Sequence, residues 1–326
     1  MHDPETMRRR TALAAVCEQA ANEIIDRIAG EGAGASESSH TPDFMRRPMV
    51  QVASRYESGA KTFLGTTIVA GTPAVQSLSK ALDTIFAHPN VAPFFSRQLI
   101  QRLVTSNPSP AYVARVAMVF NNDGNGVRGN LRAVVRTLLL DAEARGAVSN
   151  SSSGKLREPM LRLAAWARAY GVTSPSGAWA VGNTSDPATR LAQSPLRSPS
   201  VFNFFRPGYV PPNSALGSAA LVAPEFQIAN ESSVVGYVNF MQRAVAGSVG
   251  DITPDYSTLL PIADDAQVLI DEINLVLAAN QLGVATATVL VTALQTMPSG
   301  TDAARRSRIN AALVLVLAAP EFIVQK

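Results

Sequence analysis

The sequence predicts an all-α protein: an orthogonal multi-helix bundle with a long irregular insert rich in proline and aromatic residues, and at most a minor β-hairpin. Three observations support this fold class. Apolar residues recur at 3.6-residue spacing in a long series of segments. Hydrophobic residues make up 47% of the 326 residues and charged residues 16%, which is enough for a large core. Strand signals are few, and the best is the short run 66–69.

Residues 1–60 are expected to contain one helix followed by a polar loop, and one interpretation of this part is a truncated remnant. An apolar stripe predicts an amphipathic helix that ends at Gly30; its members are Leu13, Val16, Ala20, Ile24 and Ile28. The run Arg8–Arg10 resembles the start of an export signal. The apolar stretch behind it stops at Glu18, so the chain contains no convincing signal peptide.

Residues 61–326 are predicted to form a single helical domain. Thr72-Pro73 and Ser109-Pro110 provide helix starts with proline at the first position. Residues 172–222 are rich in Ser, Pro, Asn and Gly and show no helical period, so they form the expected insert. The expected helices cover about 73–88, 90–103, 109–120, 131–139, 156–170, 224–245, 265–279, 286–297 and 301–318.

Charge is divided unevenly along the chain. Residues 1–206 carry 23 basic and 15 acidic residues, a balance of +8, whereas residues 207–300 carry one basic residue and eight acids, a balance of −7. We therefore expect the basic part, 61–206, and the acidic part, 207–300, to attract each other within the domain. The specific prediction is that the acidic segment faces the basic helices of residues 97–168 through Glu225, Glu231, Asp271 and Glu272.

Metal and cofactor motifs are weak. With one Cys and three His, the sequence offers no thiolate cluster and no helical His pair, and His88 is expected to end a helix. The turn 121–126 resembles the start of a calcium loop, but its twelfth position is Arg132, which would repel calcium. The run 58–62 lacks the glycines of a phosphate loop, and Asp264-Asp265 fits a helix cap. We predict no metal and no cofactor.

Two further patterns are distinctive. Ala223-Pro224-Glu225-Phe226 recurs as Ala319-Pro320-Glu321-Phe322, and each copy is expected to start a helix. The longest apolar run, 309–324, is shorter than the ~20 residues that a bilayer requires, so no transmembrane segment is predicted.

The most distinctive stretch is the proline- and aromatic-rich loop 194–209. Prolines restrict its conformations, and its aromatic residues supply apolar area that a merely solvated loop would not need. We expect this loop to be ordered and to border a binding surface. A purely structural role, with aromatic residues pinning the loop to the helices, is the other interpretation. The candidate binding residues are Arg197, Phe202, Asn203, Phe205, Arg206 and Tyr209.

Several runs together resemble the bacterial domain-of-unknown-function 1800 family. They occur in family order over about residues 60–326, which resembles the C-terminal portion of a longer protein, and they are 61–65, 88–94, 97–99, 126–131, 154–159, 194–207 and 223–226. The resemblance implies a helical fold, an exported or periplasmic setting and a sulfatase-like protein as a partner. It supplies no reaction and no catalytic residue.

The leading hypothesis is a noncatalytic helical binding or assembly protein of the bacterial envelope that acts with a partner protein. The alternative is a hydrolase-type enzyme with an Asp/Glu/Arg site near residues 155–210, so the sequence does not decide whether the protein is an enzyme. Binding of a polyanion through the basic half is a weaker, third interpretation, and nucleic acid is not expected as a partner.

Overall fold

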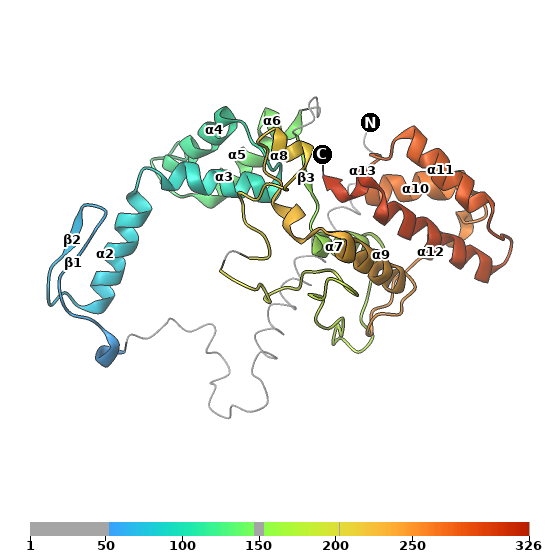
Figure 1. The fold of residues 1–326 in the computed structure, drawn as a ribbon, viewed down its shortest axis with the longest axis horizontal. Helices are drawn as coiled ribbons and strands as arrows, with labels where there is room; N and C mark the ends of the chain where they lie inside the picture. The colour runs from blue at the N-terminus through green and yellow to red at the C-terminus, as the bar shows by residue number, and fades with distance from the viewer. Residues whose placement is uncertain (1–51, 147–152, 202, 326) are drawn as a thin grey trace. The chain divides into compact units, whose positions relative to one another are not determined.

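The computed structural model describes residues 52–146, 153–201 and 203–325, and it is mostly helical (Figure 1). The chain separates into two compact units, residues 1–91 and 92–326, which are described one at a time. The all-α prediction is confirmed. The domain boundary expected at residues 60 and 61 stays a prediction, and the helix expected over residues 13–28 lies outside the described residues.

Unit 1 contains a short β-hairpin and one long helix. Strand β1 (Lys61–Phe63) pairs antiparallel with β2 (Thr66–Ile68), behind a 3₁₀ turn, η2 (Ala53–Arg55). Leu64 and Gly65, between the strands, both have positive φ angles, as a two-residue hairpin turn requires. The strand expected over 66–69 is thus confirmed. Helix α2 (Ala74–Ala87) follows and ends at His88, as predicted.

Unit 2 begins with four helices, one short strand and a further helix before the insert. They are α3 (Val91–Leu103), α4 (Pro110–Asn121), α5 (Leu131–Leu140), α6 (Ala142–Arg145), β3 (Lys155–Leu156) and α7 (Pro159–Ala169). The second half adds α8 (Ala215–Ser218), η3 (Pro224–Ile228), α9 (Glu231–Val245), η4 (Leu260–Ile262), α10 (Ala266–Ala278), α11 (Val284–Gln295), α12 (Asp302–Ala318), α13 (Pro320–Ile323) and β4 (Val324–Gln325).

Side-chain caps explain most helix starts. The Ser109 hydroxyl accepts from the Tyr112 amide at the start of α4, and Asp265 caps α10 by accepting from two amides. Two expectations differ from the structure. The helix expected over 224–245 is divided into η3 and α9, because Asn230 forms a capping box with Ser233 and so starts a new helix. Thr72 does not cap α2; its hydroxyl donates to the Val69 carbonyl, and Pro73 occupies the cap position.

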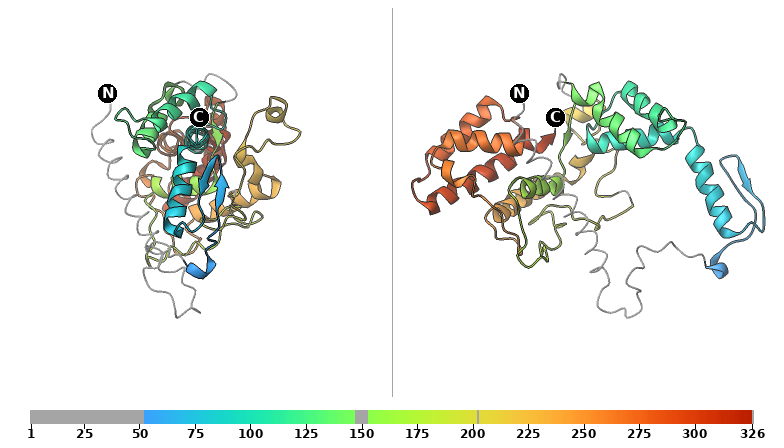
Figure 2. Two further views of the ribbon diagram at one scale, coloured as in Figure 1. Left: turned by 90° about the vertical axis from the view of Figure 1, so that its left-hand side faces the viewer. Right: turned by 180° about the vertical axis from the view of Figure 1, so that it is seen from behind.

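The main core of unit 2 lies among α7, α9, α10, α11 and α12. Helix α12 contacts α9, α10 and α11, and Figure 2 shows these helices side by side. Trp166 of α7 is buried and donates to the hydroxyl of Tyr256, which in turn donates to the Val245 carbonyl. Outside this core, α4 packs against α5, and the buried Tyr112 hydroxyl donates to the Leu138 carbonyl.

The insert over 172–222 is irregular apart from α8, as predicted. It lies close against the core at Gly236 of α9. A Cβ atom built at Gly236 would lie 2.3 Å from the Pro187 carbonyl oxygen, so only glycine permits this approach. The insert is therefore held to the helices at a defined place. Over the residues that the structure describes, no helix is both long enough and apolar enough to cross a bilayer.

Candidate functional site

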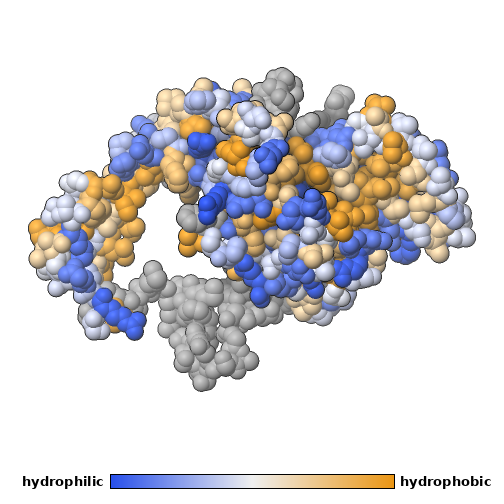
Figure 3. Space-filling view, in the orientation of Figure 1, coloured by the Kyte–Doolittle hydropathy of each residue, from blue (hydrophilic) through white to orange (hydrophobic). Residues whose placement is uncertain are grey.

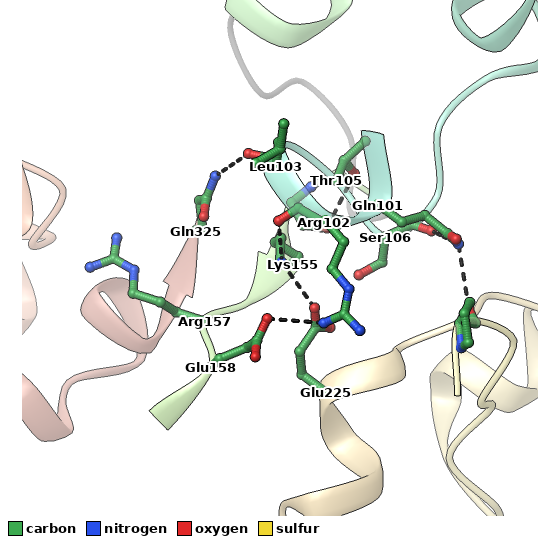
Figure 4. Close-up of polar contacts among 12 residues, drawn as sticks. Gln101, Arg102, Leu103, Thr105, Ser106, Lys155, Arg157, Glu158, Glu225 and Gln325 are labelled. Carbon is green, nitrogen blue, oxygen red and sulfur yellow. Dashed lines mark hydrogen bonds and ion pairs between the residues drawn. The ribbon is translucent and has the colours of Figure 1, made fainter. Parts of the chain in front are cut away.

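The short strand β3 is the centre of a polar cluster that connects five parts of unit 2. We call Arg102, Lys155, Glu158, Gln193 and Glu225 the β3 cluster. Figure 4 shows four of its members converging from α3, β3, the start of α7 and η3. Strand β3 itself pairs antiparallel with β4, which places Lys155 opposite Gln325 and Leu156 opposite Val324.

Lys155 and Glu225 form a buried ion pair. The Lys155 Nζ lies 3.0 Å from a Glu225 carboxylate oxygen, and the two side chains are 0% and 1% exposed. Lys155 also donates to the Arg102 carbonyl oxygen, 2.7 Å away at the end of α3. Within the described residues, the second carboxylate oxygen of Glu225 accepts no hydrogen bond. Burial of both charges is costly unless they are paired, so this contact ties β3 to η3 and to α3.

Glu158 stands at the cap position of α7 and connects two other elements. One of its carboxylate oxygens accepts from Arg102 at 3.0 Å, and the other accepts from the Gln193 amide at 2.5 Å. Gln193, in turn, accepts a hydrogen bond from the Met160 backbone amide. Pro159 follows at the first helical position, which explains why α7 starts here. Glu158 therefore fixes the first end of the loop 194–209 to the helix start.

The second end of that loop rests on α3. Phe205 is buried, and the Arg102 guanidinium lies 4.5 Å from its ring centroid. The Gln101 amide donates weakly to the Pro207 carbonyl oxygen at 3.5 Å and more strongly to Ser106 at 3.0 Å. The Arg206 backbone amide donates to the side chain of Gln227 at 2.8 Å. The loop is thus attached at both ends through Arg102.

The six predicted binding residues are not equivalent. Phe205 is an anchor in the interior, whereas Arg197 and Arg206 are exposed. Asn203 and Tyr209 are half-buried; Asn203 has a φ angle of +67°, and the Tyr209 carbonyl accepts from Ala223. Phe202 lies outside the described residues.

The sequence-based site omitted the β3 cluster. Glu158 pairs with Arg102, and Glu225 pairs with Lys155. Lysine is rarely buried in proteins, so its residue type alone would place Lys155 at the surface. Two sequence features could have indicated the cluster. Three of the five residues 155–159 are charged and lie directly before the apolar helix α7, and the motif 223–226 contains an acid.

Glu225, an acid of the segment 207–300, pairs with Lys155 of strand β3 in the basic part. The expected approach of Glu231, Asp271 and Glu272 to the basic helices of residues 97–168 stays a prediction. Asp264 instead pairs with Arg305 of the C-terminal part, at 2.6 Å. The contact between the two parts therefore includes a buried ion pair, whereas exposed pairs contribute only about 0–1 kcal/mol each.

The loop 121–126 uses its oxygen atoms internally. The Asn122 side chain accepts from Gly124 and Gly126, and the Asp123 side chain accepts from Asn125, Val127 and Asn130. These bonds lower the pKa of Asp123, first through Asn130. They shape a turn between α4 and α5. In the described part of the chain, no three His, Cys, Asp or Glu side chains are grouped as metal ligands would be.

The geometry limits the chemistry that the β3 cluster can perform. Lys155 and Glu225 have no surface for a substrate to reach, and general acid–base catalysis requires contact with the reacting group. Arg102 and Glu158 are only partly buried, and they already contact each other, Phe205 and Gln193. The cluster therefore holds α3, β3, the start of α7, η3 and the insert in register.

Comparison with known proteins gives a family and no function. No curated protein and no solved structure matches the chain. One family model, described as a protein of unknown function (DUF1800), matches residues 27–324. The match extends further toward the N-terminus than the motifs that begin near residue 60. Because it covers most of the described fold, including the β3 cluster and the loop 194–209, the chain belongs to the DUF1800 family.

Proposed function

We propose that the protein is a noncatalytic helical binding or assembly protein that takes a partner protein on the loop 194–209. One observation carries this proposal: the loop has buried ends and an exposed apolar middle. Leu196 is 80% exposed and Val201 is 96% exposed, while Gln193 and Phe205 are buried. Large apolar side chains held in water by an anchored loop are typical of surfaces that another protein covers.

The anchors reduce the cost of binding. A loop that is already ordered loses less conformational entropy when a partner binds. Arg197 lies between Leu196 and Val201, and Arg206 follows them; arginine is enriched at protein interfaces. Asn203 and Tyr209, half-buried beside them, complete the proposed contact surface.

The wider setting of this proposal comes from the family. Membership is consistent with a role in the bacterial envelope and with a sulfatase-like protein as the partner. An apolar loop middle favours a protein over a nucleic acid, because nucleic-acid binding is dominated by phosphate contacts from many basic side chains. The single helical domain expected over 61–326 belongs to the same proposal.

A hydrolase-type activity near residues 155–210 is the second candidate. It is favoured by the half-buried Arg102 beside Glu158, a charged pair at the edge of the β3 cluster. Under this alternative, Glu158→Gln would abolish a hydrolytic activity. Under the binding proposal, Glu158→Gln would weaken binding because the loop loses its first anchor.

The test is a binding titration of the purified sulfatase-like protein with the full chain. We expect Leu196→Asp and Val201→Asp each to weaken binding about tenfold or more, as a charge placed in an apolar contact does. Val289→Asp, on the exposed face of α11, is the matched control and should bind like the wild type. A titration in which the wild-type chain does not bind would remove this partner, and equal affinity for all three variants would remove the loop as the site.

A further inference from the structure

We propose that Arg157 and Arg162 form a binding site for a phosphate-type dianion beside helices α7, α9 and α13. Arg157 lies between β3 and α7, and Arg162 lies near the start of α7. Their guanidinium groups contact aromatic rings of α13 and α9. The proposal does not depend on the loop 194–209, because it rests on two cations for which the described chain provides no acid.

Arg162 differs from the other buried cations that the structure describes. Lys155 pairs with Glu225 at 3.0 Å, and Arg308 of α12 donates to three backbone carbonyl oxygens at 2.6–2.9 Å. Arg162 is only 7% exposed, but no carboxylate of the described residues pairs with it. Its Nε donates to a single carbonyl oxygen, that of Arg157, at 2.7 Å. Because a buried charge is costly unless it is paired, Arg162 requires a further partner.

The position of Arg162 is fixed by contacts that leave part of its guanidinium unused. The guanidinium carbon lies 4.8 Å from the centroid of the Tyr237 ring, and this contact uses the flat face of the group. The Tyr237 hydroxyl accepts from Arg162 and donates to the Leu317 carbonyl oxygen at 3.0 Å. A guanidinium carries several N–H donors in a rigid plane, so donors remain for one more acceptor.

Arg157 is the second cation of the proposed site. It is half-buried, and its guanidinium carbon lies 4.6 Å from the centroid of the Phe322 ring. Figure 4 shows its side chain directed away from Glu158 and Glu225, and these two acids pair with other cations of the β3 cluster. Over the ranges that the structure describes, neither Arg157 nor Arg162 forms an ion pair with a carboxylate.

The two guanidinium charges act on each other and on one hydroxyl. Burial lowers the pKa of Arg157 and of Arg162, and the charge of Arg157 lowers the pKa of Arg162 further. Burial also raises the pKa of Tyr237 to about 12, and both guanidinium charges oppose this rise. Arginine keeps its proton in proteins, so both positive charges persist and require compensation by a bound anion.

The number and shape of the charges indicate the class of ligand. A phosphate group carries about two negative charges at about pH 7, which matches two guanidinium groups, whereas a single carboxylate would neutralise only one. The planar fork of arginine also suits phosphate oxygens. Figure 3 shows hydrophilic residues among the apolar ones on the surface over α7 and α9. A small anion can approach such a mixed surface more readily than the mostly apolar surface along α2.

The test is a calorimetric titration of the full chain at constant ionic strength in chloride buffer. The ligands are inorganic phosphate, glycerol phosphate as a phosphomonoester, and acetate. We expect saturable binding of phosphate, and binding of acetate that is weaker by about tenfold or more. Tighter binding of glycerol phosphate than of inorganic phosphate would support a phosphomonoester as the ligand, and the reverse order would support the free ion.

Three variants assign the binding to this site. Arg157→Gln removes one charge and Arg162→Lys keeps the charge but lacks the planar fork, so each should weaken phosphate binding about tenfold or more. Arg168→Gln, at an exposed position of α7, removes the same charge as Arg157→Gln and should bind like the wild type. Circular dichroism checks that each variant folds, and Arg157→Gln, at a half-buried position, keeps the test decisive if Arg162→Lys does not fold.

Three results would overturn the proposal. The first is a wild-type chain that does not bind phosphate saturably. The second is equal phosphate affinity in Arg157→Gln and Arg168→Gln, which would place any bound phosphate elsewhere. The third is acetate binding as tight as phosphate binding, which would exclude a dianion as the preferred ligand.

Discussion

The two copies of Ala-Pro-Glu-Phe have the same sequence and opposite burial. In residues 223–226, Glu225 is buried against Lys155, and Phe226 is 37% exposed. In residues 319–322, Phe322 is 0% exposed, and the half-buried Glu321 accepts from the hydroxyl of Thr286 at 2.5 Å. Both copies begin a short helix with proline at its first positions. Local sequence thus determines the turn, and the neighbouring element determines which side chain enters the core.

The neighbouring element is the same short segment in both cases. Lys155 of β3 faces the first copy through Glu225. Two residues later, the Arg157 guanidinium lies 4.6 Å from the ring centroid of Phe322, and the Arg157 amide donates to Ile323. The segment 155–157 therefore contacts the glutamate of the first copy and the phenylalanine ring of the second, and these are the side chains that are buried.

The largest effect is expected from breaking the buried pair. Lys155→Met leaves the Glu225 carboxylate buried without a cation, which costs about 3–5 kcal/mol of the free energy of unfolding. The measurement is urea unfolding followed by tryptophan fluorescence, since Trp166 and Trp179 both lie in unit 2.

The double variant Lys155→Met/Glu225→Leu is the control for that effect. Apolar side chains of similar volume commonly replace a buried ion pair at little cost, so most of the lost stability should return. If the free energy of unfolding of Lys155→Met lies within about 0.5 kcal/mol of the wild-type value, Glu225 is not an isolated buried charge in that variant.

The two phenylalanines provide a second test of the comparison. Phe322→Ala removes a fully buried ring and should cost about 3–5 kcal/mol. Phe226→Ala removes a ring that is more than one-third exposed, and we expect a loss of about 1 kcal/mol or less. Urea midpoints of the two variants, measured side by side, check the difference; equal losses would contradict the reversed burial.

A smaller effect is expected at Glu321. Its carboxylate accepts from Thr286 and from the Gly283 amide, where α11 begins. Glu321→Gln keeps one acceptor oxygen and should cost only about 1 kcal/mol. Thr286→Val removes the hydroxyl donor and, combined with Glu321→Gln, should add less than the sum of the two single losses. Strict additivity in this double-mutant cycle would mean that the two side chains do not act together.

The half-buried Asp251 should make stability depend on pH. Hydrogen bonds from Ser174 and Ser176, and then from the Ala180 amide, lower the pKa of Asp251 from 3.8 to about 2. The charged form makes these bonds, so their contribution is present above about pH 4 and is lost as the pH falls toward 2. Asp251→Asn should remove this part of the pH dependence of the urea midpoint. A variant with the wild-type pH profile would exclude Asp251 as its source.

Periodicity predicted the long helices well because each buries one stripe, as in α10 and α12. It failed where a single polar side chain interrupts the pattern, as Asn230 does between η3 and α9. Strand β3 has two residues, too few for any period, so neither it nor its pairing with β4 could be read from the sequence. The loop 194–209 was recognised from its prolines and aromatic residues. Its anchors were missed because Arg102 and Glu158 come from elements outside the loop.

The pairing of β3 with β4 has a consequence for the folding pathway. Lys155 and Gln325 are separated by 170 positions in the sequence (325 − 155), whereas the contacts within α10, α11 and α12 are local. Closing a loop of this length brings an entropic penalty before any contact forms, so local helices should form first and β3 should be joined last. Substitutions at Lys155 or Phe322 would then accelerate unfolding and leave the folding rate nearly unchanged. The contacts of strand β3 would thus form late in folding and would control the unfolding rate of unit 2.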